Sequence, residues 1–187
     1  MDSLKISPDQ LQNGDVLLYE HKRHISFFAL AIRIITGSKF VHSSIIINKS
    51  NNKFVLEQLS IRSHCFLPFY YAFPGEIIHA VRPFFPVPEI DNSYFNREGY
   101  GYRNIIDSLI NHTVGLIFKN WKYIPFISVH STKDNCSVLI AKILKLSTNA
   151  IWCKFPEVVE PDDYFNHSES FHYLGVVDWK DANTSNS

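Results

Sequence analysis

Three side chains in this sequence have types and positions that suit acyl-transfer chemistry: a histidine, a glutamate and a cysteine, in that order. Cys136 stands at the expected start of an apolar helix, where unpaired N–H groups and the helix dipole stabilise a thiolate and can later hold an oxyanion. His42 begins a β-branched segment and could take the thiol proton and return it to a leaving group. Glu57 lies in the next apolar segment, where a carboxylate is costly unless it has a partner such as the second nitrogen of that imidazole.

Each of these residues also has a purely structural interpretation. A free cysteine is commonly a small buried hydrophobe, a histidine at a strand start is more often structural, and Glu57 could face water from an edge strand. Gln58 should point to the opposite face from Glu57, so the two cannot both serve. The three signals support one another, because they would place a nucleophile, a base and an orienting group on a helix start and two neighbouring strands.

The spacing of apolar residues predicts the elements that would position this site. Two neighbouring strands and the turn between them should form a hairpin carrying His42 and Glu57. A helix should begin at Cys136, with Asp134 or Asn135 as its N-cap. The expected strands are 16–19, 41–48, 53–60, 75–81 and 173–177, and the expected helices are 24–36, 103–110 and 136–146.

Four short segments resemble the circularly permuted branch of the NlpC-type papain-like superfamily, which includes the YiiX-like hydrolases and the lecithin retinol acyltransferase group. They are 13–19 (NGDVLLY), 40–46 (FVHSSII), 55–57 (VLE) and 134–140 (DNCSVLI), and the resemblance covers roughly residues 10–150. It implies an α+β, permuted papain-like fold: a small antiparallel sheet or open barrel packed against the helix that carries the cysteine.

The resemblance also implies roles for individual residues. Cys136 would be the nucleophile, His42 the base and Glu57 the orienting residue, while Gly14 and Asp15 would shape a turn beside the site. The implied reaction is cleavage of an amide or isopeptide bond through a thioester, without a cofactor. Peptides, peptidoglycan-like chains and acyl-bearing molecules are the implied substrates.

Two alternatives remain open for the function. One is a catalytically silent binding, virion or interaction protein on the same scaffold. The enzyme interpretation survives if the sulfur of Cys136 and a ring nitrogen of His42 lie within hydrogen-bond reach, and it fails if the two residues are buried on separate faces. The other is an acyltransferase or thioesterase that uses the same pair, which an apolar tunnel beside Cys136 would favour. The order and spacing of the motifs strengthen the family resemblance, and the sequence does not choose between hydrolase and acyltransferase.

Composition limits the remaining possibilities. The chain has 187 residues with 18 basic and 18 acidic side chains, and this neutral balance argues against a nucleic-acid binder. Three cysteines and the histidine spacing indicate neither a disulfide framework nor a zinc site. With no signal peptide or transmembrane run, we expect a cytoplasmic protein, although virion packaging or release by lysis would leave no trace. We expect one domain over 1–180, an elaboration at about 83–131 and a disordered tail at 181–187.

Overall fold

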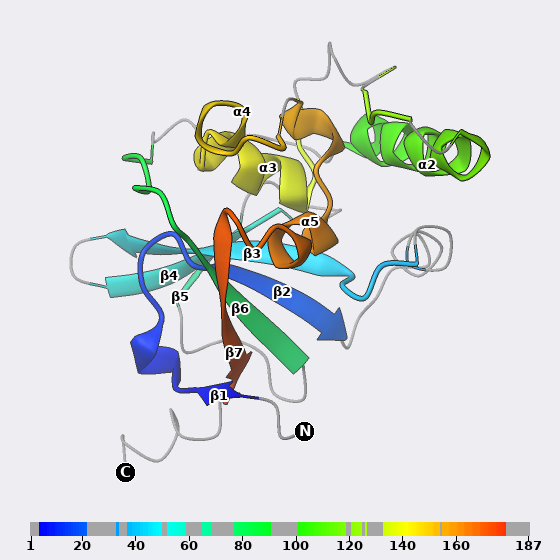
Figure 1. The fold of residues 1–187 in the computed structure, drawn as a ribbon. Helices are drawn as coiled ribbons and strands as arrows, with labels where there is room; N and C mark the ends of the chain where they lie inside the picture. Colours follow the sequence, from blue (N-terminus) through cyan, green and yellow to red (C-terminus); the bar gives the residue numbers. More distant parts are fainter. Residues whose placement is uncertain are drawn as a thin grey trace.

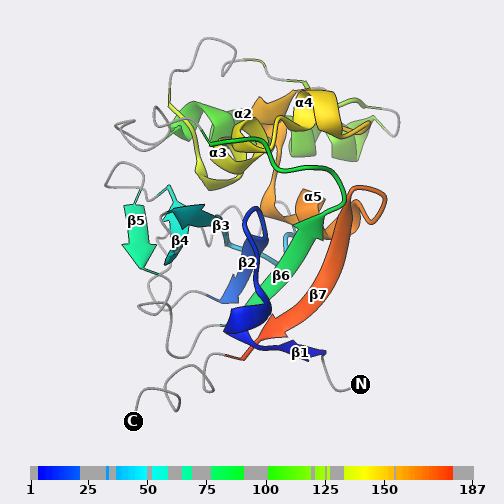
Figure 2. The ribbon, with the colours of Figure 1, turned by 90° about the vertical axis from the view of Figure 1, so that its left-hand side faces the viewer.

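The computed structural model describes residues 4–21, 33, 37–49, 52–58, 65–68, 77–90, 101–118, 121–124, 126, 133–153 and 155–178. A mixed sheet of seven strands forms its centre, in the order β1-β7-β6-β2-β3-β4-β5. The described helices lie over one face of this sheet (Figures 1 and 2). The α+β class predicted from the sequence is therefore confirmed.

The strands are β1 (Lys5–Ile6), β2 (Val16–His21), β3 (His42–Lys49), β4 (Asn52–Glu57), β5 (Cys65–Pro68), β6 (Ile77–Pro83) and β7 (Phe171–Val177). The helices are α2 (Tyr102–Ile117), α3 (Cys136–Ile143), α4 (Leu146–Asn149) and α5 (Pro161–Asn166), with 3-10 turns η1 (Pro8–Gln10) and η5 (Pro156–Val158). β1 pairs with β7 in parallel, whereas the other pairs are antiparallel. The described strands end in two separate edges, β1 and β5, so the sheet is not closed into a barrel, and the parallel pairing of β1 makes it mixed where an antiparallel sheet was expected. The permuted papain-like arrangement stays a prediction.

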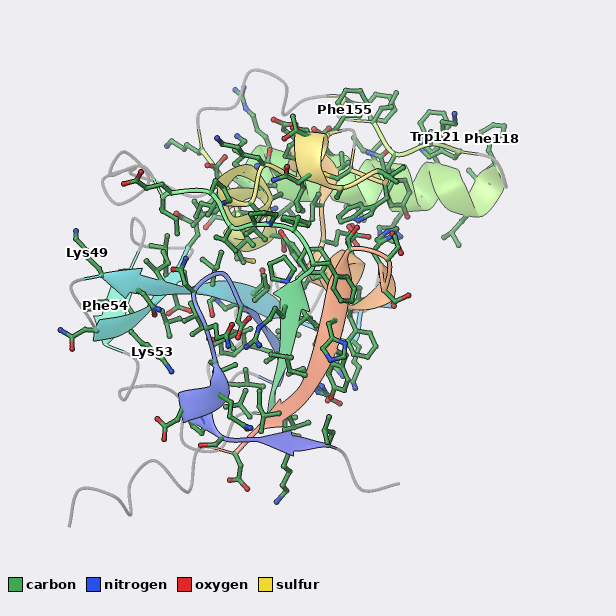
Figure 3. All side chains as sticks on the ribbon, turned by 60° about the vertical axis from the view of Figure 1, so that its left-hand side comes forward. Lys49, Lys53, Phe54, Phe118, Trp121 and Phe155 are labelled. Atoms are coloured by element: carbon green, nitrogen blue, oxygen red, sulfur yellow. The ribbon has the colours of Figure 1, made fainter. Side chains whose placement is uncertain are left out.

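The predicted hairpin is formed by β3 and β4. Asn48 faces Lys53 and Lys49 faces Asn52 across its turn, and Figure 3 shows Lys49 and Lys53 at this end of the sheet. On the other side, β2 pairs with β3 so that Tyr19 lies opposite His42. The hairpin and β2 therefore bring three separate segments of the chain to the strand end where His42 lies.

Both faces of the central strands are buried. Val16 and Leu18 on β2 belong to the core on the helix side, which includes Leu139 of α3. Leu17 and Tyr19 belong to a second core on the opposite face. This explains why β2 is a continuous apolar run and not an alternating one, since each face of the strand is covered.

The turn before β2 is held by a buried carboxylate. Asp15 is fully buried and accepts hydrogen bonds from the guanidinium of Arg82 at 2.7 and 2.8 Å. Gly14 has φ +89°, and a Cβ there would lie 2.1 Å from a methyl of Val87. The turn was expected beside the site, but the register places it at the other end of β2, where Asp15 lies beside Ile46, four residues or about 13 Å along the strand from His42.

The helices differ from the sequence expectations mainly in where they end. α2 continues to Ile117, and α3 stops at Ile143 because Lys145 adopts a left-handed conformation, φ 51°, before α4 begins. Among the described residues, the expected elaboration at 83–131 contains α2, and its extent stays a prediction. The helix expected at 24–36, apart from Arg33, and the tail at 181–187 lie outside the described residues.

Candidate active site

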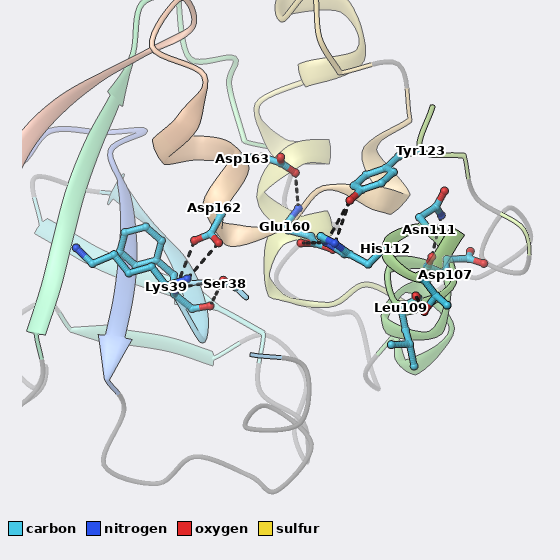
Figure 4. A network of polar contacts seen from close by, with 12 residues as sticks. Ser38, Lys39, Asp107, Leu109, Asn111, His112, Tyr123, Glu160, Asp162 and Asp163 are labelled. Atoms are coloured by element: carbon cyan, nitrogen blue, oxygen red, sulfur yellow. Dashed lines mark hydrogen bonds and ion pairs between the residues drawn. The ribbon is translucent and has the colours of Figure 1, made fainter. Parts of the chain in front are cut away.

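The segment that leads into β3 is fixed from two directions. The hydroxyl of Ser38 donates to the carbonyl of Phe40 at 2.7 Å, and the carboxylate of Asp162 on α5 accepts from the amides of Lys39 and Phe40 at 3.2 and 3.3 Å (Figure 4). The ring of Phe40 is buried in the helix-side core. These contacts define where β3 starts, and therefore where the side chain of His42 lies.

His42 is joined to Glu57 in the interior of the protein. Nε2 of His42 donates to Oε2 of Glu57 at 2.8 Å, and the two side chains are only 9% and 3% exposed. The ring of Tyr19 packs against the imidazole with the ring centroids 5.1 Å apart. Because Glu57 engages Nε2, the imidazole is held in one orientation with Nδ1 left for a second partner.

Cys136 is the first residue of α3, as the sequence predicts. Asn135 is the N-cap, and its side chain accepts from the amide of Val138 at 2.9 Å. Its carbonyl accepts from Leu139 at 3.0 Å, which starts the helical hydrogen-bond series. α3 packs along β3 through an almost wholly buried apolar face. The helix therefore presents the Cys136 thiol, and the positive end of its dipole, to the start of β3.

The surroundings of Cys136 favour the thiolate. Burial of the thiol acts to raise its pKa, but the charge of His42, a hydrogen bond from its side chain, and hydrogen bonds from the amide and hydroxyl of Ser43 lower the pKa to about 6. Cys153 is also buried, yet burial together with the charges of Asp163 and Glu157 raises its pKa to about 12. The structure thus places an acidic thiol beside the His42–Glu57 pair.

The sequence assigned no role to Ser43, Tyr164 and Tyr19, which lie at or beside this site. Ser43 hydrogen-bonds to Cys136, and its hydroxyl lies 3.2 Å from that of Ser137. Tyr164 on α5 donates to the carbonyl of Ser137 at 2.7 Å, and it is fully buried. Ser43 stands within the histidine motif and could have been found there, whereas no local pattern connects Tyr164 or Tyr19 with this site.

The described residues contain no group of three or more His, Cys, Asp or Glu side chains that could hold a metal ion. None of their helices combines the length and apolar character needed to cross a bilayer.

The comparison with solved structures gives a weak likeness in fold. No family model matches the chain, and no curated protein matches it in sequence. A solved structure of the metalloprotein YiiX from Escherichia coli O157:H7 is similar with a TM-score of 0.40 and 16% identity, over 76% of this chain and 67% of that chain. YiiX gives its name to one of the groups that the sequence motifs resemble, but a likeness of this size carries no argument about activity.

Proposed function

We propose that this protein is a cysteine hydrolase of the amidase or peptidase type, with Cys136 as nucleophile, His42 as general base and acid, and Glu57 as the residue that orients His42. One observation carries the proposal: the imidazole is held on one side by a buried carboxylate at 2.8 Å and hydrogen-bonds on the other to a thiol whose pKa is lowered to about 6. This is the arrangement of nucleophile, base and orienting group that covalent acyl transfer requires.

The reaction follows from these positions. The thiolate of Cys136 attacks the carbonyl carbon, and the negative charge that develops on oxygen is stabilised at the start of α3, where the amide of Cys136 is the proposed donor. His42 gives its proton to the leaving nitrogen as the C–N bond breaks, which leaves a thioester on Cys136. His42 then takes a proton from water as the water attacks the thioester, and the C–S bond breaks to release the carboxylic acid and restore the thiolate of Cys136 beside the imidazolium.

Glu57 acts through His42 and does not need to reach the substrate. Its carboxylate fixes the ring rotation and stabilises the imidazolium that forms in each half of the reaction. Ser43 donates to the sulfur and so keeps it in the ionised form between turnovers. The proposed substrates are peptides, peptidoglycan-like chains or acyl-bearing molecules that present an amide carbonyl.

An activated ester tests the proposal without knowledge of the natural substrate. With 4-nitrophenyl acetate we expect a burst of nitrophenolate in a one-to-one ratio with protein, and an added acetyl group on Cys136 detected by mass spectrometry. The acetyl group should be removed by hydroxylamine, as a thioester is. The variant Cys136→Ala should show no burst, and the matched variant Cys153→Ser should keep it, because the Cys153 thiol is protonated at neutral pH. Acetylation of Cys153 at the same rate as Cys136 would contradict the proposal.

A further inference from the structure

The helical layer contains a cavity of about 450 Å³ that is separate from the thiol site. Neither Cys136 nor His42 is among the described residues that line it. Its walls are mostly apolar and include the rings of Tyr123, Trp152 and Phe155, and Figure 3 shows Phe155 near the helical end of the molecule. The volume lies within the range of roughly 300–1,000 Å³ that small-molecule sites occupy.

A few polar groups converge on this apolar cavity. Asp163 lines it, and its Oδ2 accepts from the amide of Glu160 at 2.8 Å, whereas the described residues offer no hydrogen-bond donor to its Oδ1. The indole Nε1 of Trp152 is buried and has no acceptor in the described part of the chain. The ring of His167 stacks on that indole, with the ring centroids 4.1 Å apart and the planes at 6°, and so fixes the orientation of the indole.

Two lining residues have pKa values raised by burial and, to a smaller extent, by nearby carboxylates. The pKa of Asp163 is raised to about 7, first by burial and then by the charges of Glu160 and Asp162. The pKa of Cys153, another lining residue, is raised to about 12 by burial and by the charges of Asp163 and Glu157. Burial is the larger cause in both groups and disfavours any isolated charge, while His112 acts on Asp163 in the opposite direction. The smaller contributions from Glu160, Asp162 and Glu157 are the ones that favour a cation beside Asp163.

We propose that this cavity binds a small organic cation, an ammonium group carried on an aromatic or aliphatic body. The ammonium group pairs with Oδ1 of Asp163, the oxygen that does not accept from the Glu160 amide; Figure 4 shows Asp163 and its bond to Glu160. The body packs against Tyr123, Trp152 and Phe155, where cation–π attraction adds to apolar contact. Lys122 lines the cavity but forms no ion pair with Asp163 in the described structure, so it leaves that carboxylate available.

Three probes of similar shape and different charge test this inference on the unmodified protein. Isothermal titration calorimetry should show saturable binding of 2-phenylethylammonium, at least about tenfold weaker binding of neutral 2-phenylethanol, and none of anionic 3-phenylpropionate. Affinity for the cation should increase between about pH 6 and pH 8, because Asp163 loses its proton in that interval. Equal binding of the cation and the alcohol, or no saturable binding of the cation, would overturn the proposal.

A pair of neighbouring substitutions locates the charge that acts. Asp163→Asn keeps an oxygen for the Glu160 amide, so α5 should still start normally, but cation binding should weaken at least about tenfold and lose its pH dependence. Asp162→Asn makes the same charge change one residue away, where the carboxylate faces Lys39 and Phe40. It removes one cause of the raised pKa of Asp163, so the pH dependence should move to lower pH, but binding at about pH 8 should change by no more than about twofold. An equal loss in both variants would show that Asp163 is not the ligand-binding group.

Discussion

Replacement of His42 by alanine should change the pH profile of Cys136 more than its rate at neutral pH. In the wild-type protein the charge and hydrogen bond of His42 act against burial to bring the pKa of the thiol from its ordinary value of 9.0 to about 6. The substitution removes both effects and leaves most of the burial, so the pKa should return to 9 or above. The midpoint of the reactivity profile therefore moves up by at least about three pH units.

The effect on rate is smaller than this shift suggests. At about pH 7 the ionised fraction of Cys136 falls about 90-fold, but each thiolate becomes about 20-fold more nucleophilic, since reactivity rises with pKa with a Brønsted coefficient of about 0.4–0.5. The net loss is then only about fourfold at pH 7 and about 20-fold at pH 6. At about pH 9 the variant should react about tenfold faster than the wild-type protein. The two profiles should therefore cross.

The measurement is the second-order rate with 4,4′-dipyridyl disulfide from about pH 5 to pH 10, followed by the absorbance of the released thiopyridone. A background with Cys65→Ser and Cys153→Ser leaves Cys136 as the single thiol. His79→Ala is the matched control, because it removes another buried imidazole, one that is bonded to Glu20 and Tyr173. If His42→Ala acted only by making the sulfur of Cys136 more accessible, the rate would increase by the same factor at every pH, and the midpoint of the pH profile would not move.

Two results would refute this reasoning. If the wild-type midpoint lies near 9, the thiol is not activated, and the site lacks the property on which the proposed function depends. If the midpoint lies near 6 in both proteins, the helix start and Ser43 supply the stabilisation, and His42 is not the partner of Cys136.

Three further predictions concern the site and the fold. Glu57→Gln should lower turnover of 4-nitrophenyl acetate by more than about 100-fold, because the imidazole loses the charge that orients it, while Cys136 should remain the labelled residue in mass spectrometry. Gly14→Ala should lower the melting temperature more than Gly37→Ala. Both glycines have positive φ, but only at Gly14 would the new Cβ clash with a neighbouring side chain, that of Val87. Equal losses would contradict the packing argument. The hydrogen bond to Glu160 raises the pKa of His112, so protonated His112 should stabilise the folded protein. In thermal unfolding at several pH values, the wild-type protein should be more stable than His112→Gln by the largest margin below about pH 6.5. That margin should disappear as the pH rises through the raised pKa of His112.

The parts of the site that the sequence predicted are those with a local pattern. The β3–β4 hairpin is visible as two β-branched runs around a polar turn, and the start of α3 is visible because Asn135 is a good N-cap before an apolar helix. The same apolar spacing continues past Ile143, which is why the end of α3 was expected three residues too late. Only the left-handed backbone at Lys145 marks the break, and a lysine gives no signal of it.

The parts that were missed depend on contacts between distant segments. Asp162 fixes the start of β3 from more than a hundred residues away, and Tyr164 reaches the carbonyl beside Cys136 from the same short helix. The strand register that sets Tyr19 against His42 is decided by which faces are buried, and β2 is apolar on both. Periodicity along the chain carries no information about such pairings, so the supporting residues of the site could not be deduced from it.

The two cysteines whose side chains the structure describes, Cys136 and Cys153, differ in the sign of the charge beside them. Both thiols are buried, and burial acts to raise the pKa of each one. Cys136 lies beside His42 and has a pKa of about 6, whereas Cys153 lies near Asp163 and Glu157 and has a pKa of about 12. Burial is the larger cause for Cys153, and the charges of Asp163 and Glu157 add to it; those same charges should favour an ammonium group in the cavity. A ligand that neutralises Asp163 should therefore lower the pKa of Cys153 and leave that of Cys136 unchanged, so labelling of the two thiols would distinguish the two sites.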